Sequence, residues 1–368
     1  MREDWEYKGL GEVCDIYQPK TISNEMLVKG GKYPVYGANG TIGFYNRYNH
    51  TDSEILLTCR GATCGTINVS QPYSWINGNA MVIHRKSDYL DFKYLYFLMT
   101  SLDYSLIING AAQPQITRAR LAPIQVAIPP KPTQLSIVSE FDKLNELIQI
   151  KKEQLKDYDT LAQSIFYEMF GDPVENEKGW EVKTFGEIGT LERGAGISKK
   201  DFVDDGLPCI HYGQLHTIFG AYTRKTITFI PKDLLPKYKI AYPGDLILAI
   251  TSEDVGGSCK STAWLGDYDV VVGSDAAIFH HNQNGIYLSY YTRTKAFYNE
   301  KAKYAKGFKV THISTKEIAS ISICVPPLSI QNTFANKIEQ IERQKTIIQE
   351  SITDLETLLA SRMQYWFD

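Results

Sequence analysis

One group of residues in this chain has the composition of a catalytic site. Asp172 precedes Glu181-Val182-Lys183, which resembles the motif of metal-dependent nucleases. In such sites, carboxylates and a lysine converge on a divalent ion at the scissile phosphate. However, the same Trp-Glu-x-Lys text occurs 175 residues earlier, where Glu6-Tyr7-Lys8 has no preceding Asp partner. We therefore interpret this tetrapeptide as a structural element and not as a nuclease site.

Other catalytic motifs are absent from the sequence. It contains no GxxxxGK[ST] phosphate loop, no GxSxG elbow and no Asn/Asp-Pro-Pro-Tyr/Phe tetrapeptide of amino-methyltransferases. His211 and His216 lie five residues apart, and none of the six cysteines forms a CxxC pair, so no metal-ligand spacing is present. We predict no catalytic residue, no metal site and no cofactor bound by this chain. The scattered cysteines also favour a reducing, cytoplasmic location.

Polar side chains suited to DNA recognition gather in loops of the first half of the chain. Arginine can bond guanine bidentately, and asparagine or glutamine can do the same with adenine. The segment 110–120 is rich in these types, and the loops at 59–63 and 76–79 are similar. The DNA-binding candidates predicted here are Asn39, Arg60, Thr63, Asn77, Gln113, Gln115, Arg118 and Arg120.

A basic, aromatic-rich segment in the second half predicts phosphate contacts. Between residues 290 and 309, lysines and arginines alternate with tyrosines and phenylalanines, and Glu300 is the only acid. Lysines of this kind neutralise phosphates and position a duplex without reading its sequence. The candidates in this half are Arg193, Lys199, Tyr212, Gln214, Lys260, Arg293, Lys301, Lys303, Lys306, Lys309 and His312.

The elements that must position these loops are present twice. Gly11-Glu12 recurs as Gly186-Glu187 at an offset of 175 residues, and Pro129-Pro130 recurs as Pro326-Pro327 at an offset of 197. Gln134 and Gln331 share the second offset. The chain therefore contains two copies of a unit of about 170–190 residues, each with a body of short predicted strands. One helix is expected in each body, at about 90–105 and 285–305.

Each copy ends in a long helix whose apolar stripe has a period of 3.5 residues, typical of a coiled coil. The predicted seam consists of Phe141, Leu144, Ile148, Lys151, Leu155, Ile338, Ile341, Lys345, Ile348, Ile352 and Leu355. The alternative is that each helix packs separately on its own body, for which extra apolar residues such as Leu147 and Ile347 provide some support.

These patterns predict an α+β chain in which two β-rich bodies are separated by two antiparallel helices, with an internal pseudo-two-fold repeat. The expected boundaries are 1–130 and 173–327 for the bodies, and 131–172 and 328–368 for the helical spacers. Both helical segments are acidic, whereas the bodies are nearly neutral. No run of about 18 apolar residues exists, so we expect no membrane span.

As a set, these features resemble the specificity subunits of Type I restriction–modification enzymes. The resemblance covers nearly the whole chain and rests on Gly110–Thr117, Pro129-Pro130 and Gln134, followed by a long helix. Its second copy is Gly307–Ser314, Pro326-Pro327 and Gln331, and Met169–Pro173 resembles the family's joint between halves. Copy two departs from copy one at Phe308–Thr311, which lacks the Gln-Pro pair.

The resemblance implies two target-recognition domains that read a bipartite double-stranded DNA target across a non-specific spacer. It also implies two modification subunits that bind S-adenosylmethionine and methylate adenine, and restriction subunits that use ATP and Mg²⁺. The acidic helices are then the expected docking frame for the modification subunits. Two alternatives stay open: a specificity subunit of a related system without the Type I translocase, and a non-catalytic coiled-coil scaffold or protein-binding protein.

Overall fold

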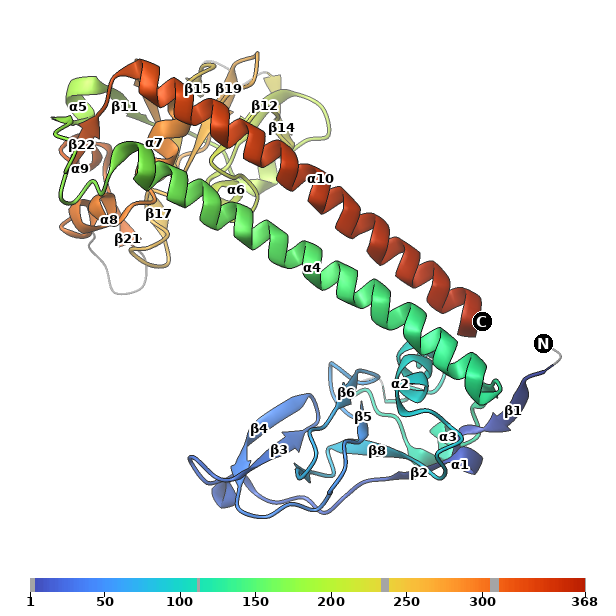
Figure 1. Cartoon of the computed structure of the whole chain (residues 1–368). Helices are drawn as coiled ribbons and strands as arrows, with labels where there is room; N and C mark the ends of the chain where they lie inside the picture. Colours follow the sequence, from blue (N-terminus) through green and yellow to red (C-terminus); the bar gives the residue numbers. More distant parts are fainter. Residues whose placement is uncertain (1–3, 111–112, 233–237, 305–310, 368) are drawn as a thin grey trace. The chain divides into compact units, whose positions relative to one another are not determined.

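The computed structural model describes residues 4–110, 113–232, 238–304 and 311–367 (Figure 1). The chain divides into two compact units. Unit 1 consists of Met1–Lys152 with Glu350–Asp368, and unit 2 consists of Glu153–Gln349. Each unit therefore contains one β-rich body and one end of each long helix, α4 (Lys131–Phe170) and α10 (Leu328–Phe367). The predicted α+β class is confirmed.

The body of unit 1 is built on the sheet β2-β8-β5-β6, beside a smaller sheet β4-β3-β7 and the antiparallel pair β1-β9. Its elements are β1 (Glu6–Gly9), α1 (Leu10–Val13), β2 (Cys14–Tyr17), η1 (Asn24–Met26), β3 (Tyr33–Gly37), β4 (Gly40–Tyr45), β5 (Ile55–Thr58), β6 (Ile67–Val69), β7 (Trp75–Ile76), β8 (Ala80–Arg85), α2 (Phe92–Ser101), α3 (Arg118–Leu121) and β9 (Gln125–Ile128).

The body of unit 2 has the corresponding sheet β11-β20-β16-β18-β13, a second sheet β14-β12-β19-β15, and the pairs β10-β22 and β17-β21. Its elements are β10 (Glu181–Thr184), α5 (Phe185–Ile188), β11 (Gly189–Arg193), η2 (Lys199–Asp201), β12 (Leu207–Ile210), α6 (Tyr212–Thr217), β13 (Tyr222–Thr223), β14 (Thr228–Ile230), β15 (Lys239–Ala241), β16 (Leu246–Ala249), β17 (Thr251–Ser252), β18 (Ser261–Trp264), β19 (Val270–Val272), β20 (Ala276–His281), α7 (Gly285–Tyr291), α8 (Lys295–Ala302), β21 (Thr311–His312), α9 (Thr315–Ala319) and β22 (Ser322–Val325).

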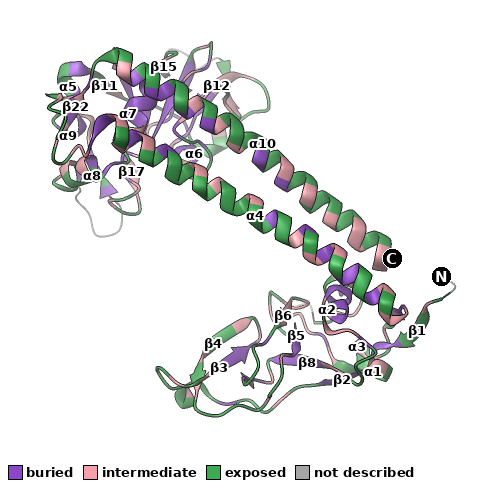
Figure 2. Ribbon diagram, in the orientation of Figure 1, coloured by how far each residue is buried: buried purple, intermediate pink, exposed green. Residues whose placement is uncertain are grey.

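The central strands β5 and β16 are buried along their whole length, because side chains on both faces of each strand contact other layers (Figure 2). The predicted helix at 285–305 is two helices, α7 and α8. The break lies at 292–294, where the Thr294 hydroxyl accepts a hydrogen bond from the backbone N–H of Phe297 and begins a new helix. None of the described helices is long and apolar enough to cross a membrane.

The repeated glutamines perform the same task in both units. Gln134 donates from Nε2 to the carbonyl of Pro129 at 2.9 Å and accepts from the backbone N–H of Asp91 at 2.7 Å. Gln331 donates to Pro326 at 2.8 Å and accepts from Asn284 at 2.9 Å. Both glutamines are fully buried. Each one therefore fastens the start of a long helix to the N-cap of the body helix, α2 or α7.

The ends of the long helices are parts of the body cores. Ile137 and Phe141 at the start of α4 belong to the core of unit 1, and Phe166 and Phe170 at its end belong to the core of unit 2. The two helices pack antiparallel, so α10 begins in unit 2, where Phe334 is fully buried, and ends in unit 1. Pairing between the helices and packing on the bodies thus occur together.

Seven of the eleven predicted seam residues are buried and the other four are partly exposed. The buried positions are Phe141, Leu144, Ile148, Ile338, Ile341, Ile348 and Ile352; the partly exposed ones are Lys151, Leu155, Lys345 and Leu355. The ammonium of Lys345 lies 2.7 Å from the Asp159 carboxylate of the facing helix. A polar side chain at such a position favours one register over others.

Candidate nucleic-acid interface

In unit 1, two loops that are far apart in sequence meet at the edge of the main sheet where β5 ends. The backbones of Arg60 and Gln115 form an antiparallel bridge, and the N–H of Ile116 donates to the Cys59 carbonyl at 3.0 Å. Gly61 sits at this turn with φ +91°, a left-handed conformation that favours glycine. We call this backbone pairing the strand-end junction.

Unit 2 contains the same junction with different side chains. The backbones of Thr251 and His312 pair, and the N–H of Ile313 donates to the Ile250 carbonyl at 3.1 Å. His312 and Ile313 follow Gln115 and Ile116 at the offset of 197 residues that the repeat predicts. One backbone arrangement therefore presents arginine and glutamine in unit 1, and threonine and histidine in unit 2.

A second pair of equivalent residues lies at the same edge, at the ends of β2 and β11. Gln18 donates from Nε2 to the carbonyl of Gly78 at 2.8 Å, and Arg193 donates from Nε to the carbonyl of Ser274 at 2.6 Å. Gln18 was not among the predicted residues. The sequence did contain a signal for it, since Gln18 precedes the predicted Arg193 by the repeat offset of 175.

The polar side chains of unit 2 form a continuous row across this edge, which we call the polar row. Arg193 Nη2 lies 3.6 Å from the Asp275 carboxylate, which in turn lies 3.5 Å from the Thr251 hydroxyl. The same hydroxyl lies 3.1 Å from His312 Nδ1. The side chains of Arg193 and Asp275 are 54% and 41% exposed. The row therefore offers hydrogen-bond donors and acceptors to a ligand from solvent.

Most of the other predicted residues lie near these loops or elsewhere on the surface of their unit. In unit 1, Asn39, Thr63, Gln113, Arg118 and Arg120 are exposed. In unit 2, Lys199 and Lys303 are exposed, Tyr212 is partly exposed on α6, and Lys260 donates to the carbonyl of His216 at 2.7 Å. The guanidinium of Arg293 donates to the Ser261 carbonyl at 3.1 Å and lies over the Tyr290 ring. Lys306 and Lys309 lie outside the described residues.

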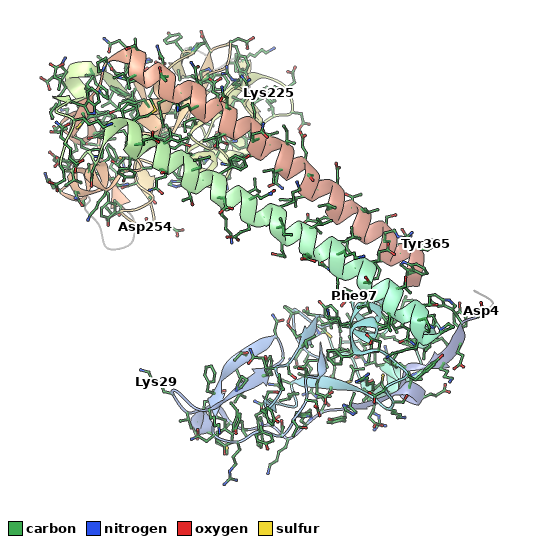
Figure 3. All side chains as sticks on the ribbon, in the orientation of Figure 1. Asp4, Lys29, Phe97, Lys225, Asp254 and Tyr365 are labelled. Carbon is green, nitrogen blue, oxygen red and sulfur yellow. The ribbon has the colours of Figure 1, made fainter. Side chains whose placement is uncertain are left out.

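Three predicted residues are buried and hydrogen-bonded inside their units, which corrects the expectation that they face DNA. The Asn77 side chain accepts from the Ile22 N–H at 3.0 Å, and that of Gln214 accepts from the His211 N–H at 2.8 Å. Lys301 is 3% exposed, and its ammonium donates to the carbonyls of Gly256 and Ser258. It thereby holds the loop on which Asp254 is labelled in Figure 3.

The electrostatics of the edge in unit 2 are set by charged pairs and by a neutral histidine. Burial lowers the pKa of His211, and the nearby Lys199 lowers it further, so this imidazole is uncharged at neutral pH. In the part of the chain that the structure describes, no group of three or more His, Cys, Asp or Glu side chains could hold a metal ion.

Comparison with known proteins agrees with this geometry. The family model of the Type I restriction modification DNA specificity domain matches residues 2–157 and, a second time, residues 177–357. The chain is 22% identical to the specificity subunit of the Type I restriction enzyme MjaVIII from Methanocaldococcus jannaschii, over 92% of this chain and 86% of that protein.

Two solved structures share the fold. The S subunit of a Type I restriction–modification system from M. genitalium is similar with a TM-score of 0.57 and 12% identity, over 99% of this chain and 96% of that chain. A chain from a structural study of complex assembly and conformational transition of the Type I system has a TM-score of 0.63 and 17% identity, over 99% and 97% of the two chains. Since the family model matches both halves, the chain belongs to the Type I restriction–modification specificity subunits and is a DNA-recognition subunit, not a catalytic one.

Proposed function

We propose that each unit reads one half of a bipartite DNA target through its strand-end junction and the loops beside it. The observation that carries this proposal is the repeated backbone with different side chains. Arg60 and Gln115 in unit 1 correspond to Thr251 and His312 in unit 2. A shared backbone would approach the duplex in the same way in both units, while different side chains would select different bases.

We further propose that two methyltransferase subunits dock on the helices α4 and α10, and that restriction subunits join this complex. Support comes from large apolar side chains that are exposed on helices which are otherwise acidic and polar. These residues are Leu147, Ile150, Leu161, Ile347 and Leu358. S-adenosylmethionine would bind the methyltransferase subunits, and ATP and Mg²⁺ the restriction subunits. A complex that acts on cellular DNA in this way would be cytoplasmic.

The test is selection of DNA from a randomised duplex pool by this chain in complex with its co-expressed methyltransferase. We expect the bound sequences to contain two short specified elements separated by unspecified base pairs. A single continuous element would contradict reading by two units. Failure to recover a complex with the methyltransferase would contradict the docking proposal and would favour a scaffold function.

A further inference from the structure

We propose that Gln18 and Arg193 are equivalent base-reading residues of opposite hydrogen-bonding character. Gln18 would present an acceptor that selects a base with an exocyclic amino group, and Arg193 would present donors that select guanine. This inference rests on the proposed function, since it requires each unit to read its own half-site. It adds the residue in each unit that distinguishes the two halves.

The positions are equivalent in the fold. Gln18 directly follows β2, and Arg193 is the last residue of β11. β2 pairs with β8 and β11 pairs with β20, both antiparallel, so each residue meets the loop that precedes the partner strand. Each side chain donates to one carbonyl of that loop, Gly78 or Ser274. This shared hydrogen bond fixes the direction in which the remaining polar atoms point.

The hydrogen bonds of Gln18 leave it an acceptor. Its Nε2 donates to the Gly78 carbonyl at 2.8 Å and to the Cys59 sulfur at 3.2 Å, which engages both amide hydrogens. The side chain is exposed, so Oε1 remains for a ligand. In the major groove, amino groups that donate to such an acceptor belong to adenine N6 and cytosine N4.

The hydrogen bonds of Arg193 leave it a donor. Its Nε is engaged by the Ser274 carbonyl, so the two terminal nitrogens form its outer end. A guanidinium that presents two parallel donors matches O6 and N7 of guanine. Nη2 also lies 3.6 Å from the Asp275 carboxylate, which holds the guanidinium in place. We therefore assign Asp275 as a positioning residue.

The residue beside each reader changes together with it. Asp275 corresponds to Asn79 in unit 1, since each immediately precedes the equivalent strand, β20 or β8. The cationic Arg193 thus has an anionic neighbour, whereas the neutral Gln18 has a neutral amide at the same place. This agreement within one chain is expected if the two residues act as a pair at each site.

The experiment uses the complex of the full chain with its methyltransferase and a randomised duplex pool whose bound fraction is sequenced. For Arg193→Gln, we expect selection of guanine at one position of one half-site to fall by about tenfold or more, in favour of adenine or cytosine. For Gln18→Arg, we expect the other half-site to gain guanine at its corresponding position. The base that Gln18 selects in the wild-type complex distinguishes adenine from cytosine.

Arg224 provides a matched control in unit 2. Its side chain is 55% exposed and binds a carbonyl, that of Leu265, and a carboxylate, that of Glu339, as Arg193 does, but it lies against α10. Arg224→Gln should leave both half-sites unchanged. Asp275→Asn should reduce guanine selection while binding to scrambled duplex stays constant, which a merely structural role would not produce.

Two results would overturn the inference: unchanged preferences in both Arg193→Gln and Gln18→Arg, or changes from both variants in the same half-site. Gln18→Arg keeps the test valid if Arg193→Gln fails to fold, since it alters the other unit. A wild-type complex that selects no bipartite sequence would instead contradict the proposed function itself.

Discussion

Glu140 joins the two long helices at the C-terminal end of α10 in unit 1. Its carboxylate accepts hydrogen bonds from the Arg362 guanidinium and from Trp366 Nε1. These contacts, chiefly that with Arg362, hold the pKa of Glu140 below its ordinary value. Trp366 in turn stacks on Trp5 with ring centroids 6.2 Å apart. One carboxylate therefore connects α4, α10 and the N-terminal segment.

The lowered pKa makes the contribution of Glu140 to stability dependent on pH. A carboxyl group whose pKa is lower in the folded state stabilises the fold above its unfolded pKa, and this stabilisation is lost as pH falls through the folded pKa. We expect Glu140→Gln to reduce the free energy of unfolding by about 0.5–1 kcal/mol at pH 7 and to have little effect near pH 3. Urea unfolding at both pH values measures this difference.

Glu146 is the control for this prediction, because it is exposed on the same helix. Glu146→Gln should give nearly the same small change at both pH values. If Glu140→Gln destabilised the chain equally at pH 7 and pH 3, its hydrogen bonds would not depend on the charge of the carboxylate.

Lys301 and Lys303 are two residues apart on the same segment but should behave differently. Lys301→Met removes the donor to two backbone carbonyls, so we expect a loss of about 1–3 kcal/mol in the free energy of unfolding. Lys303 is exposed beside Glu300. If Lys303 contacts a phosphate, Lys303→Ala should lower the slope of log K against log salt by roughly 0.9 on target and scrambled duplexes alike.

Salt titration of DNA binding and urea unfolding of both lysine variants separate the two roles. A Lys303→Ala complex that lost affinity only for the specific duplex would mean that this residue reads bases. An unchanged salt slope would place the phosphate contacts of unit 2 elsewhere.

At the residue scale, sequence indicated residue types better than their roles. A lysine-rich segment is visible in the sequence, but whether Lys301 faces solvent depends on a loop of distant residues that folds beneath it. Asn77 and Gln214 were misassigned for the same reason, since their partners at Ile22 and Thr228 become neighbours only in the fold. Gln134 and Gln331 were found through the repeat, but their buried hydrogen bonds were not predictable.

At the scale of elements, the long helices followed from their 3.5-residue period because heptad patterns are local in sequence. The period does not show that the ends of each stripe enter different cores. Ion pairs mark both regions of the helix pair, Glu140 with Arg362 in unit 1 and Asp159 with Lys345 in unit 2. Both pairs can form only if the segments between them have matching lengths.

Deleting one heptad from α4 alone, residues 147–153, should therefore break this match. We expect loss of assembly with the methyltransferase, or a changed target spacing, with the bases of each half-site unaltered. Deleting residues 351–357 of α10 as well should restore the match. Because seven residues span about 10 Å of helix, the unspecified spacer should then shorten by about three base pairs.

Selection from a randomised duplex pool measures the spacing, and size-exclusion chromatography measures assembly. The double deletion is the control for the damage caused by any deletion. If the single deletion preserved both assembly and spacing, the paired helices would not set the distance between half-sites.

At the scale of the whole molecule, the presence of two recognition bodies makes specificity separable. Exchange of residues 1–130 for the corresponding body of another specificity subunit should change one half of the selected target and leave the other half intact. The physical reason is that each strand-end junction is formed by residues of one body only. Selection experiments on the chimera and both parents test this, and a change in both halves would contradict independent reading.

The duplication was the most informative whole-chain feature of the sequence, since the offsets of 175 and 197 residues bring equivalent positions into correspondence. The domain boundaries at residues 130, 172 and 327 remain a prediction. The base sequence of the target was not predictable, because it depends on which loop side chains meet the groove and on the shape of the DNA.

The composition of unit 1 has a consequence for the synthesis of the protein. Its body and its part of α4 are made first, but Glu350–Asp368, which complete it, are made about 200 residues later. At about 5–20 residues per second, this delay is roughly 10–40 s. Unit 2 is one continuous segment and can close before unit 1 does. The apolar stripe of α4 near Phe141 and Leu144 therefore waits on the ribosome without Leu355, Leu359 and Trp366, and during this interval the nascent chain has most need of a chaperone.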